Sequence, residues 1–204
     1  KHDAVLIATG VYKTRDLPDS SAEGIVNALD YLTASNRKSF GDEVPEYDSG
    51  ALNAAGKRVV VIGGGDTAMG CVRTAIRQGA ESVKCLYRRD RANMPGSQRE
   101  VANAEEEGVE FVWLSAPLGF EGDAVSGVKV QKMRLGAPDA TGRQMPEVIT
   151  GADYIEEADL VVKALGFEPE DVPTLWGVPE LAVTRWGTIK ADFTTGKTSL
   201  DGVY

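Results

Sequence analysis

The stretch KRVVVIGGGDTA at residues 57–68 decides the fold of this chain. Its first half is a run of β-branched residues, which is typical of a strand buried on both faces of a parallel sheet. Three glycines follow, and behind them apolar residues recur with helical spacing as far as Gly79. A strand that leads through a glycine turn directly into a helix indicates a nucleotide-binding α/β fold.

The segments that follow repeat the alternation of strand and helix. Residues 82–87 and 109–114 are predicted strands, and the segment between them holds a helix that begins after Pro95-Gly96 with a Ser97–Glu100 capping box. A further strand is expected at 159–166. Strands and helices that alternate with short connections form parallel sheets with right-handed crossovers. We therefore expect an α/β fold with a doubly wound, Rossmann-like parallel sheet.

Two other regions have their own patterns. Residues 116–149 consist of short alternating pieces separated by glycine-containing turns, which predicts an antiparallel β-meander inserted into the parallel fold. Upstream, Ser20 and Glu23 have the spacing of a capping box, and apolar residues with helical spacing predict one helix over residues 20–35. Residues 36–56 are polar and are expected to form a linker, whereas residues 3–10 are expected to form a short buried strand.

The glycine turn carries the clearest functional signal, the pattern Gly63-x-Gly65-x-x-Ala68. Gly63 permits a tight turn, Gly65 lets the backbone approach a pyrophosphate, and Ala68 lets the helix lie close to the strand. Free N–H groups at the helix start suit an anion. The predicted cofactor-binding residues are Gly63, Gly64, Gly65, Asp66, Thr67 and Ala68. The alternative is a turn that only packs the helix, with Asp66 and Thr67 as capping residues; the entropy that three glycines lose on folding argues against it.

The end of the second strand indicates which dinucleotide is bound. In such folds an acidic residue there accepts hydrogen bonds from the ribose of NAD or FAD, whereas arginine accommodates the 2′-phosphate of NADP. Here the strand ends in Tyr87-Arg88-Arg89-Asp90-Arg91. Arg88, Arg89 and Arg91 are therefore predicted to bind NADP(H). The alternative is a solvated charged turn, in which Asp90 neutralises part of the positive charge.

Composition excludes several classes of function. Lys and Arg number 22 against 31 Asp and Glu, a net charge of −9 that disfavours nucleic acid and anionic membranes as partners. A single histidine, His2, excludes histidine-centred metal sites and Ser-His-Asp triads, and Cys71 and Cys85 form no CxxC. We therefore nominate no metal ligand. The absence of a disulfide framework favours the cytoplasm.

Taken together, these segments resemble a known family, the small (beta) chains of bacterial NADPH-dependent glutamate synthase. The matching segments are residues 61–68, Tyr87-Arg88-Arg89, residues 93–97, and the flanking residues 8–13, 29–36 and 198–204. Relatives of the same architecture are the NADP-linked ferredoxin oxidoreductase subunit and the flavin half of dihydropyrimidine dehydrogenase. The resemblance covers essentially the whole chain and implies a fold of the pyridine nucleotide-disulfide reductase type.

In that family an NADPH-binding domain interrupts a FAD-binding domain. The resemblance therefore implies four parts: residues 1–14 end the first half of the FAD domain, 15–56 form a helix and linker, 57–184 form the NADPH domain, and 185–204 begin the second FAD half. The chain starts with Lys1 rather than methionine, and we expect it to be a piece of a longer protein. FAD ligands and iron–sulfur cysteines are expected mostly outside it.

The resemblance also implies a reaction, hydride transfer from NADPH to FAD. Electrons would pass through iron–sulfur clusters to a large (alpha) subunit that makes glutamate from 2-oxoglutarate and glutamine. Hydride transfer needs positioning rather than acid–base groups, so we nominate no catalytic side chain. Ala164 and Gly166, at the carboxyl end of a predicted strand, are expected near the nicotinamide. The alternatives are a reductase for another acceptor, or a nucleotide-binding module that is inactive as this chain alone.

Overall fold

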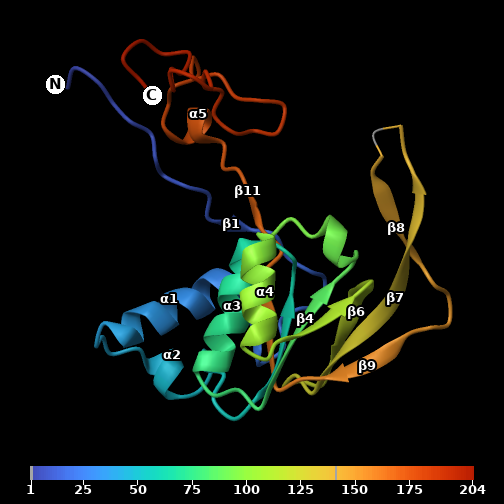
Figure 1. Ribbon diagram of the computed structural model, residues 1–204. Coiled ribbons are helices and arrows are strands. Elements are labelled where there is room, and N and C mark those ends of the chain that lie inside the picture. The colour runs from blue at the N-terminus through green and yellow to red at the C-terminus, as the bar shows by residue number, and fades with distance from the viewer. Residues whose placement is uncertain (1, 141) are drawn as a thin grey trace. The chain divides into compact units, whose positions relative to one another are not determined.

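In a computed structural model, which describes residues 2–140 and 142–204, the chain divides into two compact units (Figure 1). The central unit is Asp16–Gly166, and the terminal unit combines Lys1–Arg15 with Phe167–Tyr204. The boundary at Phe167 assigns residues 167–184 to the terminal unit, whereas the sequence interpretation placed them in the NADPH domain. The assignment of the units to nucleotide and flavin domains stays a prediction.

A five-stranded parallel sheet forms the middle of the central unit. Its order is β2 (Ile25–Asn27), β10 (Leu160–Lys163), β3 (Arg58–Ile62), β4 (Ser82–Tyr87) and β5 (Glu110–Trp113). Four of these strands lie where the sequence predicts them. Because all five are parallel, their carboxyl ends share one edge, and the glycine turn after β3 lies on that edge beside the end of β4.

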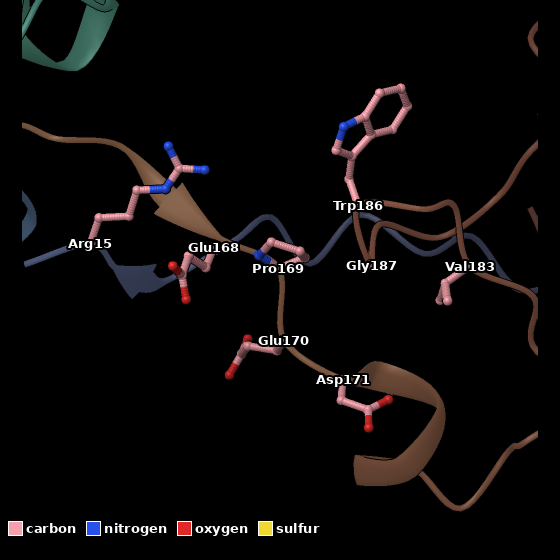
Figure 2. Close-up of a pocket in the computed structure, with 8 residues that line it drawn as sticks. All are labelled: Arg15, Glu168, Pro169, Glu170, Asp171, Val183, Trp186 and Gly187. Atoms are coloured by element: carbon pink, nitrogen blue, oxygen red, sulfur yellow. The ribbon is translucent and has the colours of Figure 1, made fainter.

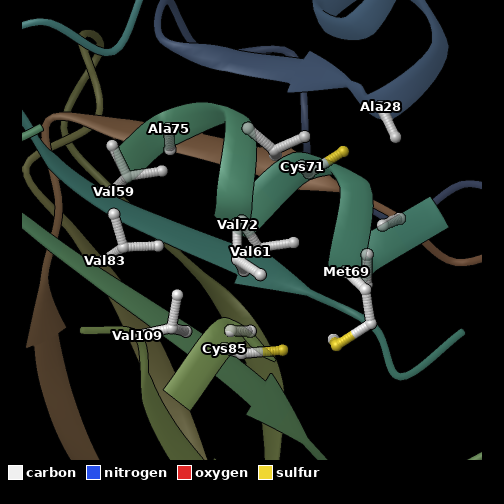
Figure 3. Close-up of a cluster of buried hydrophobic side chains, with 14 of the residues drawn as sticks. Ala28, Val59, Val61, Met69, Cys71, Val72, Ala75, Val83, Cys85 and Val109 are labelled. Carbon is white, nitrogen blue, oxygen red and sulfur yellow. The ribbon is translucent and has the colours of Figure 1, made fainter. Parts of the chain in front are cut away.

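Three helices cover one face of this sheet: α1 (Ala28–Ser39), α3 (Asp66–Arg77) and α4 (Gln98–Glu106). Alternate positions of the strands supply the apolar side chains of this face, among them Val59, Val61, Val83 and Cys85. Figure 3 shows these residues packed with Val72 and other side chains of α3. The burial of this face by helices follows from the two-residue repeat of the strands and the helical repeat of α3.

Antiparallel strands pack on the opposite face, namely β6 (Ser115–Glu121), β7 (Gly127–Pro138) and β9 (Tyr154–Glu157). β7 pairs with both of these and also with β8 (Gln144–Val148), which supplies no residue to the core on this face. Val128 and Val130 of β7 pack against Val60, Ile62 and Val161 of the parallel sheet. The predicted α/β fold with an inserted antiparallel meander is therefore confirmed. The meander takes the place that a second layer of helices would have.

The helix expected over residues 20–35 is wrong in its first half. Residues 25–27 form β2, and α1 begins only at Ala28. Ile25 and Val26 are β-branched and pair in parallel with Val161 and Val162 of β10, so the sheet edge overrides their helical spacing.

The two predicted capping boxes are also wrong. The Ser20 hydroxyl donates to Asp16 Oδ1 (2.9 Å) and to the Leu17 carbonyl, in a turn that precedes β2. Ser97 does stand at the N-cap of α4 but makes no side-chain capping bond, and Glu100 instead binds Arg73 of α3. Helix–helix ion pairing therefore takes the carboxylate that a local capping box would have used. A short helix, α2 (Pro45–Asp48), interrupts the expected linker.

The terminal unit has little regular structure. Its elements are the antiparallel pair β1 (Lys13–Thr14) and β11 (Phe167–Glu168), and the one-turn helix α5 (Val172–Leu175). Residues 3–10 were expected to form a buried strand, but Val5 makes only an isolated parallel bridge to Val203, and Val5 and Leu6 are 47% and 76% exposed. That prediction is wrong for the described chain, because no described layer packs on this segment.

Candidate nucleotide-binding site

The glycine turn joins the end of β3 to the start of α3, with Gly65 at the helix N-cap. Gly63 has a φ of +148°, and a Cβ there would lie 2.2 Å from the carbonyl oxygen of Ala164. A Cβ on Gly64 would lie 2.5 Å from the ring of Tyr87. Both glycines are therefore required by close packing within the protein, and Ala68, which is fully buried, is required for the same reason.

Gly65 is different, because a Cβ there would meet no atom within 4 Å. Its backbone is extended, with a φ of −93°, a conformation that other residues adopt without strain. Neither packing nor backbone geometry of the described residues accounts for glycine at this position. The open space beside its backbone is what a pyrophosphate would need.

The start of α3 offers several unused hydrogen-bond donors. Within residues 2–140 and 142–204, no acceptor bonds the backbone N–H groups of Gly64, Gly65, Asp66, Thr67 or Ala68. The helix also lacks a side-chain cap. Free N–H groups and the positive end of the helix dipole together favour an anion at this position. Residues 64–68 of the predicted set therefore offer backbone N–H groups without an acceptor in the described chain, whereas the Gly63 N–H donates to the Leu86 carbonyl at 3.1 Å.

The side chains of Asp66 and Thr67 do not behave as one group. Asp66 is exposed, and its Oδ1 accepts a hydrogen bond from the backbone N–H of Ser97 at 2.9 Å. Thr67 is half-buried in the first turn of α3. The sequence marked Ser97 only as a helix cap, and no local pattern indicates its bond to Asp66.

The three arginines after β4 also differ from one another. Arg91 lies in the short 3-10 helix η1 (Arg91–Asn93), and its Nη1 pairs with Glu105 Oε1 at 2.6 Å. Arg88 is exposed. Arg89 is half-buried, and its Nε and Nη2 atoms are buried without a hydrogen-bond partner among the described residues. Because buried charged donors are costly when unpaired, Arg89 is the arginine most in need of an anionic partner.

Tyr87 links the glycine turn to the arginines. Its ring packs against Gly64, and it meets the Trp113 ring edge-on with 6.4 Å between centroids. Burial raises the pKa of Tyr87, and the positive charges of Arg89 and Arg88 oppose that rise. The two arginines therefore lie close enough to Tyr87 for their charges to act on its hydroxyl group.

Ala164 and Gly166 follow β10 at the same edge of the sheet. The Ala164 N–H donates to the Ile62 carbonyl at 2.8 Å, and its own carbonyl oxygen is the atom that a Cβ on Gly63 would meet first. Gly166 has a φ of +83° and open space around its Cα. Ala164 therefore supports the glycine turn directly, whereas Gly166 ends the central unit in a conformation that favours glycine.

Sequence reasoning missed one buried charge, Lys163, the last residue of β10. Its side chain is only 5% exposed, and its Nζ binds Asp16 Oδ1 at 2.5 Å and Ser20 Oγ at 2.9 Å. The hydrogen bond from Lys163, followed by those from the Leu17 N–H and the Ser20 hydroxyl, lowers the pKa of Asp16 to about 2. A lysine inside an otherwise apolar strand was the signal that could have identified this pair.

The remaining candidates for chemistry are structural. Cys71 and Cys85 are buried and unpaired; burial raises the pKa of both thiols, that of Cys85 to about 12. Neither is therefore a thiolate at neutral pH. In the part of the chain that the structure describes, no three His, Cys, Asp or Glu side chains are grouped to hold a metal ion. Nor does any helix there have the length and hydropathy to cross a bilayer.

The terminal unit has a groove of about 510 Å³ (Figure 2). Its lining residues are Arg15, Glu168, Pro169, Glu170, Asp171, Val183, Trp186 and Gly187. Three of the four charged residues are acidic, and Glu168 also pairs with Lys13. An anionic nucleotide therefore fits the glycine turn better than this groove.

Curated relatives match the chain over its whole length, and two of them are named glutamate synthase small chains. The sequence is 79% identical to the putative glutamate synthase [NADPH] small chain of Cereibacter sphaeroides and 66% identical to the glutamate synthase [NADPH] small chain of Azospirillum brasilense. The matches cover 100% of this chain but 49% and 43% of those proteins. The chain thus spans about half the length of the relatives it matches, or less.

Solved structures and a family model show which fold family the chain matches. T. acidophilum thioredoxin reductase superposes on 98% of this chain, and 55% of that structure, with a TM-score of 0.67 at 19% sequence identity. The family model described as pyridine nucleotide-disulphide oxidoreductase matches residues 1–204. With a parallel sheet, an inserted antiparallel meander and a glycine turn at the sheet edge, this chain belongs to the pyridine nucleotide-disulphide oxidoreductase family.

Proposed function

We propose that this chain binds NADPH at the glycine turn and presents it for hydride transfer to FAD within a glutamate synthase small chain. The observation that carries the proposal concerns two sets of donors that have no acceptor among the described residues: five backbone N–H groups at residues 64–68, and the buried Nε and Nη2 atoms of Arg89. NADPH carries two anionic groups, the pyrophosphate and the 2′-phosphate, whereas NADH carries only the pyrophosphate. The names of the two relatives favour NADPH and glutamate synthesis.

Each part of the site has a separate task in this proposal. The N–H groups at the start of α3 bind the pyrophosphate, and the open space beside Gly65 admits it. Arg88 and Arg89 bind the 2′-phosphate, whereas Arg91 is already paired with Glu105. Ala164 and Gly166 leave room for the nicotinamide ring. NADPH supplies the hydride, and the protein supplies orientation, so no side chain acts as acid or base.

The wider reaction follows from the relatives. FAD and iron–sulfur clusters would be held mostly by other parts of a longer protein, and a large subunit would use the electrons to form glutamate from 2-oxoglutarate and glutamine. Two buried, unpaired cysteines suit a reducing compartment, and we place this reaction in the cytoplasm. We expect the 204-residue chain alone to bind NADPH but not to reduce an acceptor.

Nucleotide selectivity tests the proposal. The wild-type chain and an Arg88→Ala/Arg89→Ala variant are titrated calorimetrically with NADPH and NADH at two salt concentrations. Two charge-assisted hydrogen bonds are worth roughly 3–5 kcal/mol before screening, which corresponds to about two to three powers of ten in affinity. The wild type should therefore prefer NADPH, less so at high salt. The variant should lose NADPH affinity and keep that for NADH.

An Arg37→Ala/Arg134→Ala variant is the matched control, because it removes the same charge from two exposed arginines on α1 and β7. It should keep the wild-type preference. If the Arg88→Ala/Arg89→Ala variant retains the wild-type preference for NADPH, these arginines do not bind the 2′-phosphate. If the wild type binds neither nucleotide, the proposed function is wrong.

A further inference from the structure

Asp66 occupies an unexpected position for an anion-binding turn. It is an exposed carboxylate in the first turn of α3, among the N–H groups that are free to bind a phosphate. An ionised carboxylate can only accept hydrogen bonds, and it repels a pyrophosphate. Among the described residues, the hydrogen bond to its side chain is the one that Oδ1 accepts from the Ser97 N–H at 2.9 Å. The role of the Asp66 carboxylate therefore lies in the loop residue that it holds, whereas its backbone N–H stays among the donors for the pyrophosphate.

A second bond attaches the same loop to the glycine turn. The Gly96 N–H donates to the carbonyl of Gly64 at 2.9 Å, and a Cβ on Gly96 would lie only 3.0 Å from that oxygen. Residues 96–97 thus pass directly over residues 64–66 and are bonded to them at two successive amides. Two hydrogen bonds therefore hold the loop against the glycine turn.

The other end of the loop closes around the arginines. The Tyr87 hydroxyl donates to the Asn93 carbonyl at 2.9 Å. Asp90 Oδ1 accepts from the backbone N–H of Asn93 at 3.0 Å and from its Nδ2 at 2.7 Å. Hydrogen bonds between residues near its two ends therefore close the loop of residues 87–93, which contains Arg88 and Arg89. Ser97, which bonds to Asp66, lies only four residues after Asn93.

These contacts form a continuous connection from the first turn of α3 to the arginine turn. We infer that Asp66 is a positioning residue that, by holding Ser97, fixes the arginine turn relative to the glycine turn and so sets the preference for NADPH over NADH. This inference rests on the proposed function. Without the carboxylate, the Ser97 N–H loses its acceptor, and the loop keeps only the Gly96 bond beside the turn.

Three substitutions test the inference. Asp66→Ala removes the acceptor, Asp66→Asn retains an acceptor oxygen without the charge, and Ser97→Pro removes the donor from the other side. Proline suits position 97, where φ is −56° and the residue stands at a helix N-cap. Asp30→Ala is the matched control, because Asp30 is an exposed aspartate in the first turn of α1, which has 12 residues as α3 has.

The readout is the ratio of NADPH to NADH affinity in the 204-residue chain, with thermal melting as the folding control. Asp66→Ala and Ser97→Pro should each lower the ratio about tenfold, mainly by lowering the affinity for NADPH. Each substitution removes the hydrogen bond between the Ser97 N–H and the Asp66 carboxylate, a bond to a charged group. Asp66→Asn should restore most of the ratio, and Asp30→Ala should leave it unchanged. A purely structural role would lower the melting temperature and leave the ratio as it is.

Each other outcome is decisive. If Asp66→Ala and Asp66→Asn both increase the affinity for NADPH and for NADH by the same factor, Asp66 acts only as a repelling charge, and the inference is wrong. An unchanged ratio in folded Asp66→Ala and Ser97→Pro proteins also overturns it, while the proposed function stands. A wild type that binds both nucleotides equally overturns the inference and the assignment of Arg88 and Arg89 to the 2′-phosphate, while nucleotide binding at the glycine turn stands. A wild type that binds neither nucleotide overturns the proposed function together with the inference.

Discussion

Gly63 and Gly65 stand two positions apart in one motif, yet different constraints act on them. The carbonyl of Ala164 leaves no room for a Cβ at Gly63, and its φ of +148° favours glycine. Gly65 has an ordinary extended backbone and open space beside it. The first glycine therefore serves the fold, whereas no described contact requires the second, and we attribute it to the proposed approach of a pyrophosphate to the backbone.

This contrast gives a prediction at the scale of single residues. Gly65→Val should fold with a wild-type melting temperature but bind NADPH at least about tenfold more weakly, a loss of about 1.4 kcal/mol or more, because its side chain enters the phosphate space. Gly63→Ala should instead lower the free energy of unfolding by about 2 kcal/mol or more, through backbone strain and the clash with Ala164.

Calorimetric titration and urea unfolding of both variants separate the two roles. Undiminished NADPH binding by folded Gly65→Val would refute the role of this turn as a phosphate cradle. A stable Gly63→Ala protein would show that the turn can relax away from β10.

At the scale of elements, the end of β10 is held by charge as well as by apolar packing. Val161 and Val162 pack into the two opposite layers, and the next residue, Lys163, turns its buried ammonium to Asp16 and Ser20. Asp16 precedes β2, so the pair connects the segment that enters the parallel sheet with β10, the strand next to β2. A buried lysine without this partner would leave an uncompensated charge.

The pair predicts a specific pH dependence of stability. The pKa of Asp16 is lowered from 3.8 to about 2 in the folded chain. Its contribution is therefore fully present above pH 4 and is lost as the pH falls toward 2, because protonation is favoured in the unfolded chain. Asp16→Asn should remove this part of the dependence and cost roughly 1–2 kcal/mol at pH 7, a range kept low because the Asp16 side chain is 62% exposed.

Urea unfolding between pH 2 and pH 7 measures this effect. The control is Asp48→Asn, which breaks the pair of Asp48 with Lys38, whose side chains are 50% and 38% exposed. We expect it to cost less than about 1 kcal/mol. Equal losses for the two substitutions would mean that the burial of Lys163 adds nothing to the pair.

At the scale of the whole molecule, the two units differ in how much core they have. The central unit buries apolar side chains on both faces of its sheet. In the terminal unit Leu181 is the one large apolar side chain described as buried, while Leu6, Trp186 and Phe193 are strongly exposed. Small cores give low stability, so the two units should not be equally stable.

We therefore predict two thermal transitions, with the terminal unit unfolding first. NADPH at about 100 times its Kd should stabilise the central unit by about 2.7 kcal/mol and raise only the upper transition, because a ligand stabilises the unit to which it binds. Differential scanning calorimetry with and without NADPH measures both. One cooperative transition that NADPH raises as a whole would contradict this picture.

Local patterns in the sequence determined much of this protein. Short apolar runs predicted four of the five parallel strands. The helix after Gly63 and the arginines after β4 were likewise evident from a few neighbouring residues. The antiparallel meander could be predicted for the same reason, since alternating hydrophobicity and turn residues are short-range signals.

Tertiary structure alone decided the rest, because it depends on partners far apart in the chain. Residues 25–27 became a strand only by pairing with β10, more than a hundred positions away. Pairing with Glu105 distinguishes Arg91 from Arg89, whose Nε and Nη2 lack a described partner, and Asp66 meets Ser97 only where α3 and the loop before α4 converge. A local pattern fixes backbone preference and the face on which a residue lies, whereas the acceptor that a side chain finds depends on how distant segments pack together.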